Sequence, residues 1–427
     1  MQPSNNTPPI RFTEFSGAWK QREFGNIVSE YADPVATPTN GYYRLGIKSH
    51  AKGTFHSYVR PGMELSTAQM YRVAANNFIV NITFGWEHAV AITTEEDSGK
   101  LVSHRFPQFS FSEGMLPEYF KFVIIDEKFK HHLWLASPGG AGRNRVLKIS
   151  EMLEYKFWVP SQEEQQKIAL FLTNLDNLIN LHQRKYDQLV NIKKSMLNKM
   201  FPKNGESVPA VRFTGFTDAW EQRRLGDEGS TYSGLSGKTK ADFGHGEGKF
   251  ITYMNVFSNP ISSPIDVELV VKDNSQKEVQ VGDIFFTTSS ETPEEVGMSS
   301  VLAEIHGITY LNSFCFGFRP SSKIDVYYWA YMLRSGVVRR QIIRLAQGIS
   351  RYNISKNKMM DIDIPLPSSD EQKKIGTLLV KLDDLITLHR HKLERLQNIK
   401  KACLLMLFVC QSLYDDNFSL CKNESTV

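Results

Sequence analysis

The strongest constraint on this chain is that its sequence contains the same borders twice. Residues 11–25 read RFTEFSGAWKQREFG and residues 212–226 read RFTGFTDAWEQRRLG, with nine identical residues in the same order. A second pair of matching segments spans 164–194 and 371–401. Two long matches at nearly one spacing, 201 and 207 residues, indicate an internal duplication. Such a repeat has to be recognised before any other prediction is made, because it sets the architecture.

The two segments between these borders, about 23–150 and 224–355, share no obvious sequence. Both are rich in Gly, Ser, Thr, Asn and aromatic residues, a composition typical of mixed domains with many turns. Short apolar or alternating runs predict β-strands in both segments. These runs are Phe78–Phe84, Lys121–Ile125, Phe250–Tyr253 and Asp283–Thr288.

A chain of 427 residues is too long for one ordinary core, so we expect several compact parts. The repeats then place the boundaries, with the stretch from Pro202 to Pro209 as a linker. The predicted parts are a repeat segment at 1–20, a first variable domain at 21–150, a shared helix at 151–201, a linker with the second repeat segment at 202–220, a second variable domain at 221–355, a second shared helix at 356–408 and a tail at 409–427. The tail has no counterpart in the first half.

Each shared segment begins with a helix-start signature, a Ser followed by acidic residues, at Ser161 and at Ser368. Apolar residues then alternate at spacings of four and three, which is the heptad pattern of a coiled coil. About 38 helical residues at roughly 1.5 Å each predict a rod of about 57 Å. The seam residues are Ile168, Leu172, Leu175, Ile179 and His182 in the first copy, and Ile375, Leu379, Leu382, Ile386 and His389 in the second. The two histidines are interpreted as polar residues that set the register rather than as metal ligands.

A further apolar stripe lies beside each seam, which makes the apolar face wider than a two-stranded coiled coil needs. Its members are Phe171, Leu178 and Ile192 in one copy, and Leu378, Leu385 and Ile399 in the other. We expect the stripe to pack against helices of a partner, as in a four-helix bundle. The alternative is that the variable domains of this chain cover it.

Composition excludes some classes of protein without selecting one. A charged content of 22% and a hydrophobic content of 41% are ordinary for a folded protein, and a net charge of +4 permits nucleic-acid binding without requiring it. The four cysteines form no C-x-x-C pair, which argues against a disulfide framework and a cysteine zinc site. No signal peptide or membrane-length apolar run is apparent, so we expect a cytoplasmic protein of bacterial type without a membrane contact.

Motifs that would indicate an enzyme are incomplete. The stretch from Ser236 to Thr239 ends like a phosphate-binding loop, but Tyr232 stands where the first Gly is needed. The Gly-rich stretch from Gly244 to Gly248 follows a polar loop rather than an apolar strand, so it does not predict a dinucleotide site. The triplet from Asp126 to Lys128 resembles a nuclease motif but lacks a clear metal-holding partner. The sequence therefore predicts no catalytic residues, no metal ligands and no bound cofactor.

Taken together, the motifs resemble the specificity subunits of type I restriction-modification systems over nearly the whole chain. The most specific are R-F-x-x-F-x-x-A-W-x-Q-R in both halves and E-Q-x-K-I leading into the L-D-x-L-I-x-L-H helices. The stretches Met200–Glu206 and Gly282–Thr287 are also typical of the family. The resemblance implies an α+β chain with two α/β target-recognition domains, separated by two long antiparallel coiled-coil helices and related by a pseudo-twofold repeat.

The resemblance also implies partners. Such subunits read the two halves of a split sequence on double-stranded DNA and dock two modification (methyltransferase) subunits, with restriction subunits joining through the complex. S-adenosylmethionine, ATP and magnesium are then expected on those partners. Two other interpretations remain open: a coiled-coil adaptor without DNA specificity, and the recognition portion of a self-contained restriction-methylation enzyme.

DNA recognition needs cations for the phosphates and polar side chains for the base edges. The densest basic clusters precede the shared helices, next to Gly-containing loops. Each such residue is equally well explained as a solvated charge flanking a helix. The candidates are Arg143, Arg145 and Lys148 in the first half, Arg340, Arg344 and Arg351 in the second, Lys238 and Lys240 in a Gly/Ser loop, and Asn255, Ser289 and Ser290 as polar loop residues.

Overall fold

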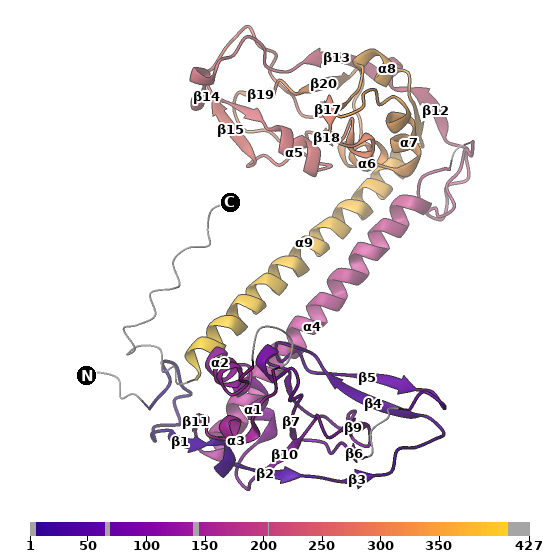
Figure 1. Ribbon diagram of the computed structural model, residues 1–427. Helices are drawn as coiled ribbons and strands as arrows, with labels where there is room; N and C mark the ends of the chain where they lie inside the picture. Colours follow the sequence, from indigo (N-terminus) through magenta and orange to yellow (C-terminus); the bar gives the residue numbers. More distant parts are fainter. Residues whose placement is uncertain (1–5, 65–68, 140–144, 204, 409–427) are drawn as a thin grey trace. The chain divides into compact units, whose positions relative to one another are not determined.

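The computed structural model describes residues 6–64, 69–139, 145–203 and 205–408 (Figure 1). The chain divides into two compact units, one formed by residues 1–181 with 393–427 and the other by residues 182–392. Each unit combines a domain containing β-sheets and short helices with stretches of two long helices, α4 (Gln162–Lys199) and α9 (Ser369–Met406). The α+β, two-domain class expected from the sequence is confirmed. The predicted tail, 409–427, lies outside the described residues.

The described residues of the first unit form three sheets. Their strand orders are β1-β11, β2-β10-β7-β8 and β3-β6-β9-β4-β5. The strands are β1 (Lys20–Glu23), β2 (Val28–Tyr31), β3 (Pro34–Val35), β4 (Tyr42–Ile47), β5 (Thr54–Val59), β6 (Met70–Arg72), β7 (Phe78–Val80), β8 (Val90–Ile92), β9 (Leu101–Ser103), β10 (Gln108–Phe111) and β11 (Lys156–Val159). The helices besides α4 and α9 are η1 (Phe24–Asn26), η2 (Gly85–Glu87), α1 (Pro117–Val123), α2 (Glu127–Leu135) and α3 (Ile149–Leu153).

Four sheets are formed by the part of the second unit that the structure describes. Their strand orders are β12-β22, β13-β20-β16-β18, β15-β14-β19 and β17-β21. The strands are β12 (Glu221–Arg224), β13 (Gly229–Ser233), β14 (Phe243–Ile251), β15 (Val267–Val270), β16 (Ile284–Thr287), β17 (Ser289–Ser290), β18 (Ser299–Val301), β19 (Thr309–Leu311), β20 (Cys315–Pro320), β21 (Tyr352–Asn353) and β22 (Asp363–Leu366). The shorter helices are η3 (Leu225–Glu228), η4 (Lys240–Asp242), α5 (Tyr253–Ser258), η5 (Pro293–Glu295), α6 (Val326–Met332), α7 (Gly336–Arg344) and α8 (Lys356–Met360).

The two variable domains share a common frame although their sequences differ. The sheet β2-β10-β7-β8 has the same order as β13-β20-β16-β18, and the ladder β1-β11 has its counterpart in β12-β22. The helices α1, α2 and α3 follow the sheet as α6, α7 and α8 do. Outside this frame, the described residues form one further sheet of five strands in the first unit and two further sheets, of three and two strands, in the second. The duplication therefore extends through the domains, and the additional sheets are where they diverge.

One strand prediction is wrong. The run from Lys121 to Ile125 predicts a strand because it is rich in Val, Ile and Phe, but most of it belongs to helix α1. Pro117 occupies the start of that helix, where its missing N–H costs nothing. The buried residues Tyr119, Phe120 and Val123 follow helical spacing and pack into the core of the unit. The run from Asp283 to Thr288 contains strand β16, whereas the runs that start at Phe78 and Phe250 form strand only as far as Val80 and Ile251.

The long helices follow the predicted spacing, and most apolar side chains of the seam are buried or half-buried. Ile168, Leu172 and Leu175 are buried in the first unit. Their counterparts Ile375, Leu379 and Leu382 are buried in the second unit, whereas Ile179 and Ile386 are half-buried. Ser161 accepts a hydrogen bond from the amide of Glu164, as expected for a helix cap.

Within the second unit the two helices run antiparallel. His182 of α4 lies against His389 of α9, with 2.8 Å between their Nδ1 atoms, and Lys193 pairs with Asp383. Residue numbers therefore rise along α4 while those of the facing residues fall along α9, as in an antiparallel pair. The first unit contains the equivalent ion pair, Lys400 with Asp176, at 2.5 Å.

The repeated segment R-F-x-x-F anchors the start of each long helix. Arg11 donates from Nε and Nη2 to both carboxylate oxygens of Glu164 at 2.7 and 2.6 Å, and Arg212 does the same to Glu371 at 2.7 and 2.8 Å. The side chain of Glu371 is fully buried and that of Glu164 is 1% exposed. A buried carboxylate is tolerated only when it is paired and hydrogen-bonded, so the arginine is required wherever the glutamate is enclosed.

The same segments bind the far end of the other long helix. In the second unit the amide of Val211 donates to the carbonyl of Lys199, at the end of α4. In the first unit the amide of Ile10 donates to the carbonyl of Met406, at the end of α9. Each repeat segment therefore links the first turn of one long helix to the last turn of the other.

Removing one partner of this pair is expected to destabilise its unit strongly. Arg212→Ala leaves the carboxylate of Glu371 buried without its counter-charge, which costs about 3–5 kcal/mol. Hydrogen exchange followed by mass spectrometry should show reduced protection in the first turns of α9. The control is Arg223→Ala, because Arg223 pairs with Glu221 and Glu228 at the surface, where a pair contributes about 0–1 kcal/mol. Equal destabilisation in both variants would contradict an anchoring role for Arg212.

Candidate nucleic-acid interface

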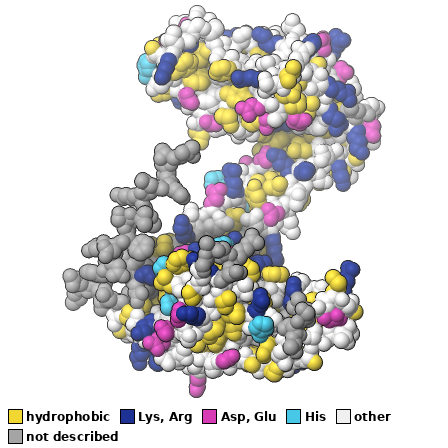
Figure 2. Space-filling model, viewed as in Figure 1, with side chains coloured by type: hydrophobic (Ala, Val, Ile, Leu, Met, Phe, Trp, Pro, Cys, Tyr) yellow, Lys and Arg dark blue, Asp and Glu magenta, His cyan; other side chains and the backbone are white. Residues whose placement is uncertain are grey.

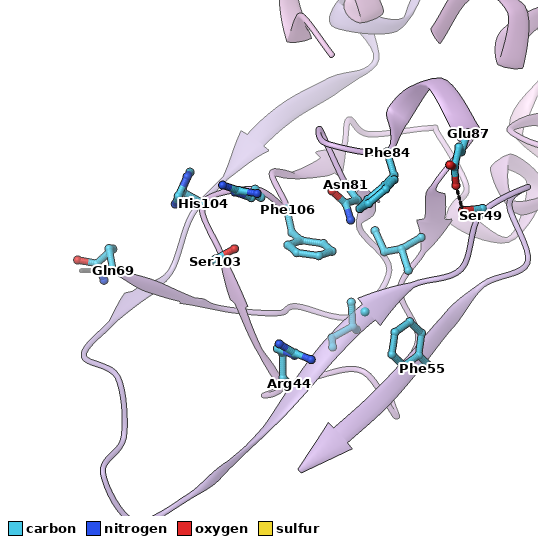
Figure 3. A pocket seen from close by; sticks show the side chains of 14 residues that line it. Arg44, Ser49, Phe55, Gln69, Asn81, Phe84, Glu87, Ser103, His104 and Phe106 are labelled. Atoms are coloured by element: carbon cyan, nitrogen blue, oxygen red, sulfur yellow. Dashed lines mark hydrogen bonds between the residues drawn. The ribbon is translucent and has the colours of Figure 1, made fainter. Parts of the chain in front are cut away.

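The first unit contains an open groove with a volume of about 970 Å³. Four separate segments of the described chain line it: strand β4 with the start of β5, Gln69 just before β6, residues 81–87, and the end of β9 with the turn that follows it. Figure 3 shows Phe106 near its centre, with Arg44 and Phe55 on one side and Asn81 and Phe84 on the other. The groove is therefore assembled by the fold from residues distant in the sequence.

The charge of the groove is positive. Arg44, His104 and Arg105 line it, and Glu87 is the one carboxylate among the described residues of the lining. Glu87 accepts a hydrogen bond of 2.6 Å from the hydroxyl of Ser49. Within the described part of the chain no carboxylate pairs with Arg44 or Arg105, so both guanidinium groups are available to an anionic ligand.

Apolar surface lies beside these cations. The rings of Phe55 and Phe84 are 46% and 40% exposed, although both are large apolar groups. Phe55 lies over strand β4 at Gly46, where an added Cβ would come within 2.3 Å of its ring. Glycine at this position is what lets the ring lie across the strand. Arginines with polar and apolar side chains are the chemistry that contacts phosphates and base edges.

In the second unit the predicted basic residues gather on helix α7 and the loop after it. The helix buries Val338 and Ile342, and Arg340 and Arg344, one turn apart, are exposed. Arg351 is also exposed and donates to the hydroxyl of Ser289 at 3.1 Å. These three arginines come from one helix and one adjoining loop, as their order in the sequence predicted.

Two neighbouring arginines have a structural role instead. Arg334 donates to the carbonyls of Val256, Phe257 and Ser299, among others, and burial lowers its pKa to about 10. Arg339 donates to three carbonyls within 294–297, and burial lowers its pKa to about 10. Both cations hold loops of the domain together.

The first unit carries its predicted basic residues after the equivalent helix, α2. The guanidinium of Arg145 stacks on Trp134, with 4.7 Å from its carbon to the ring centre, and lies 5.9 Å from Trp86. Lys148 pairs with Glu151 at 2.6 Å while remaining exposed. Arg143 lies outside the described residues.

The two predicted lysines of the Gly/Ser loop in the second unit lie in different environments. Lys238 is largely buried and pairs with Asp273 at 2.9 Å. Hydrogen bonds from Ser275, followed by Lys238, hold the pKa of Asp273 well below its usual range. Lys240 is exposed at the start of η4. Lys238 therefore braces this loop, and Lys240 faces solvent.

The predicted polar base-reading residues are corrected. Asn255 is fully buried, and its amide donates to the carbonyls of Ser263 and Asp266 while accepting from the amide of Ser263. Ser289 and Ser290 are each 7% exposed. Ser290 donates to the carbonyl of Thr292, and Ser289 accepts from Arg351. These groups are already engaged within the domain, so they do not reach a ligand.

The apolar stripe is covered only in part. Phe171 packs edge-on against Phe12, at 5.9 Å between ring centres, and Leu378 is half-buried. The repeat segment thus covers part of Phe171, which also packs against the core cluster of the first unit. The other members remain exposed, between 37% and 44%: Leu178, Ile192, Leu385 and Ile399.

The seam histidines lie against each other, with 2.8 Å between their Nδ1 atoms. Burial, followed by the neighbouring His182 and two lysines, lowers the pKa of His389. Among the described residues, no group of three or more His, Cys, Asp or Glu is arranged to hold a metal. In the same part of the chain, no helix has the length and apolarity needed to cross a bilayer.

Sequence reasoning missed the groove residues Arg44, Asn81, His104 and Arg105. They come from different segments, and only the pairing of the strands brings them together. In the sequence, the local signal was the adjacent pair His104 and Arg105. A basic pair between two short strands is common, so it does not predict a binding site. On the face drawn in Figure 2, basic and acidic side chains are interspersed over both units, which explains why the net charge of +4 does not locate a site.

The protein-family model described as the type I restriction modification DNA specificity domain matches residues 43–191 and 217–398 of this chain. The MjaVIII type I specificity subunit of Methanocaldococcus jannaschii is 27% identical over 296 residues, covering 67% of this chain and 68% of the relative. The putative MjaX specificity subunit of the same organism is 26% identical over 272 residues, covering 60% of this chain, and the match spans 59% of the relative's length.

Two solved structures are also similar in fold, at TM-scores below one half. The HsdS subunit of Thermoanaerobacter tengcongensis is 15% identical, with a TM-score of 0.46 and coverage of 92% of this chain and 96% of that one. The S subunit from M. genitalium is 14% identical, with a TM-score of 0.48 and coverage of 94% and 99%. The family model matches both halves of the chain and most of its residues, so the chain belongs to the type I restriction-modification DNA specificity family.

Proposed function

We propose that this chain reads double-stranded DNA through two separate surfaces, one in each unit, and that each surface recognises one half of a split target. The observation that carries the proposal is the groove of the first unit. It combines Arg44 and Arg105, without carboxylate partners among the described residues, with exposed aromatic rings. In the second unit the corresponding surface is formed by Arg340, Arg344 and Arg351.

The division into frame and variable parts supports a split target. The common frame holds each domain on the long helices through the same anchor, and the additional sheets differ between the units. In the first unit the groove includes strands β4 and β5 of the five-stranded sheet, whereas the additional sheets formed by the described residues of the second unit have three and two strands. Two domains with one frame and different surfaces suit two different base sequences.

The long helices are proposed to act as an antiparallel coiled coil and as the scaffold for two modification subunits. Support comes from exposed apolar side chains that recur in both units: Leu178, Leu181 and Ile399 in the first, and Leu385, Leu388 and Ile192 in the second. Exposed apolar groups gathered on a helix face are typical of surfaces that bind protein. One such set per unit fits one modification subunit per unit.

In this proposal the chemistry belongs to the partners. Modification subunits would bind S-adenosylmethionine and methylate, and restriction subunits, joined through the complex, would use ATP and magnesium to cleave. This chain would supply specificity and assembly, and the cytoplasm is where all of them meet DNA. An adaptor without DNA specificity is not favoured, because the family model describes a DNA specificity domain.

Neutralising the groove should reduce the ionic part of DNA binding. For Arg44→Ala with Arg105→Ala, we expect the slope of log K against log salt to fall by about 0.9 for each phosphate that an arginine no longer neutralises. Fluorescence anisotropy with a duplex over a salt series measures that slope. Arg72→Ala is the matched control, since Arg72 lies on the same domain but pairs with Asp33 at 3.1 Å. An unchanged slope in the double variant would exclude the groove from the interface.

Exchanging one domain should change one half of the target. We expect that replacing residues 24–155 with the equivalent domain of another family member alters one half-sequence and spares the other. These junctions keep the ladder between β1 and β11 intact. Methylation mapping of the complex with its modification subunit identifies both halves. If both halves changed together, the two domains would have to read DNA jointly.

Charging the exposed stripe should weaken assembly. Leu178→Asp with Leu385→Asp is expected to reduce the affinity for the modification subunit, because each buried leucine contributes about 1.5–3 kcal/mol. Analytical ultracentrifugation of the mixed subunits measures the reduction. The control is Asn191→Asp with Asn398→Asp, which adds the same charges at two exposed, equivalent positions. Identical assembly of both variants would show that the stripe does not dock this subunit.

A further inference from the structure

The second unit has a pocket of about 590 Å³ where its repeat segment meets the first turns of α9. Phe213 and Phe216 of the repeat segment line it together with Leu378 of the helix. Three lysines surround this apolar part: Lys373, Lys374 and Lys381. Asp370 is the one acidic residue in the described lining, so the lining carries a net charge of +2 (three minus one).

The first unit has the same frame at this place but a different charge. Counting 207 residues back, Lys373 and Lys381 correspond to Gln166 and Asn174. Lys374 corresponds to Lys167, which pairs with Glu14 at 2.8 Å. In the second unit Gly215 stands in place of Glu14, so the neutralising carboxylate is missing.

The lysine shared by both copies, Lys167 or Lys374, also contacts a different ring in each unit. In the first unit Lys167 lies over Phe12, with 5.6 Å from its nitrogen to the ring centre. In the second unit Lys374 lies over Phe216 instead, at 4.8 Å. Among the described residues, no carboxylate forms an ion pair with Lys373, Lys374 or Lys381. The described lining of the second unit thus holds three ammonium groups against the single carboxylate of Asp370, an arrangement whose mutual repulsion an anionic ligand would relieve.

We propose that this pocket of the second unit, and not its counterpart in the first, binds an acidic segment of the modification subunit that also carries an apolar side chain. The apolar side chain contacts Phe213, Phe216 and Leu378, and its flanking carboxylates pair with the lysines. DNA fits less well, because the described lining holds no arginine or asparagine of the kind that lines the groove of the first unit. The inference rests on the proposed docking of modification subunits, and it makes the two docking sites unequal.

The test replaces the distinguishing lysines with the residues of the first unit. Isothermal titration of the full chain with its modification subunit should resolve two binding events, only one of which weakens as salt rises. In Lys373→Gln with Lys381→Asn, the salt-dependent event should weaken about tenfold at low salt, which is about 1.4 kcal/mol. The other event should be unchanged. The control, Lys194→Gln with Lys401→Gln, removes two exposed lysines at equivalent positions and should leave both events as they were.

A second probe keeps failure of this inference separate from failure of the proposed docking. A fluorescent peptide alternating glutamate with leucine should bind the wild-type chain once, and binding should be abolished in Lys373→Gln with Lys381→Asn. If the modification subunit does not bind the wild-type chain at all, the docking proposal fails, and peptide binding alone then decides whether the pocket takes acidic segments. The inference is overturned if the variant binds subunit and peptide like the control, or if it lowers the salt slope for duplex DNA instead.

Discussion

The bidentate pairs of Arg11 with Glu164 and of Arg212 with Glu371 are the interactions on which the rest of each unit depends. Each glutamate lies in the first turn of a long helix and is almost completely shielded from solvent. A carboxylate cannot stay ionised there without a matched donor, and the fork of arginine supplies two parallel hydrogen bonds. This pairing of arginine with glutamate holds the repeat segment against the helix and so positions the domain that follows.

The anchor explains why one frame carries two different domains. Trp19 and Trp220, eight residues after each anchoring arginine, are buried in the two cores. Next come the equivalent ladders β1-β11 and β12-β22, which close each domain at its base. The additional sheets vary beyond this base, but they share buried residues with the frame: Ile79 of β7 packs in one cluster with Leu45 of β4 and Val102 of β9. The buried side of each additional sheet therefore belongs to the support of the domain, and its exposed side is the part that can vary for recognition.

Duplication does not make the two units chemically equal. The frame preserves the aromatic and leucine positions around the start of each long helix, whereas the exposed residues between them have diverged in charge. Glu14 and Gly215 illustrate the point, because one substitution decides whether a lysine shared by both copies is paired. Surface charges contribute little to stability, so they can change without disturbing the fold. They are consequently the positions at which a symmetric scaffold can acquire unequal partners.

The sequence by itself determined the duplication, the two long helices, and the membership suggested by the repeated motifs. These features depend on identity between the two halves and on the local spacing of apolar residues, and both can be read directly from the order of residues. Only the tertiary structure decided that Lys121 to Ile125 forms a helix, that Asn255, Ser289 and Ser290 are engaged internally, and that Arg44 and Arg105 share a groove. The physical reason is that burial and strand pairing join distant segments, so neither a side chain's exposure nor its neighbours can be read from adjacent residues.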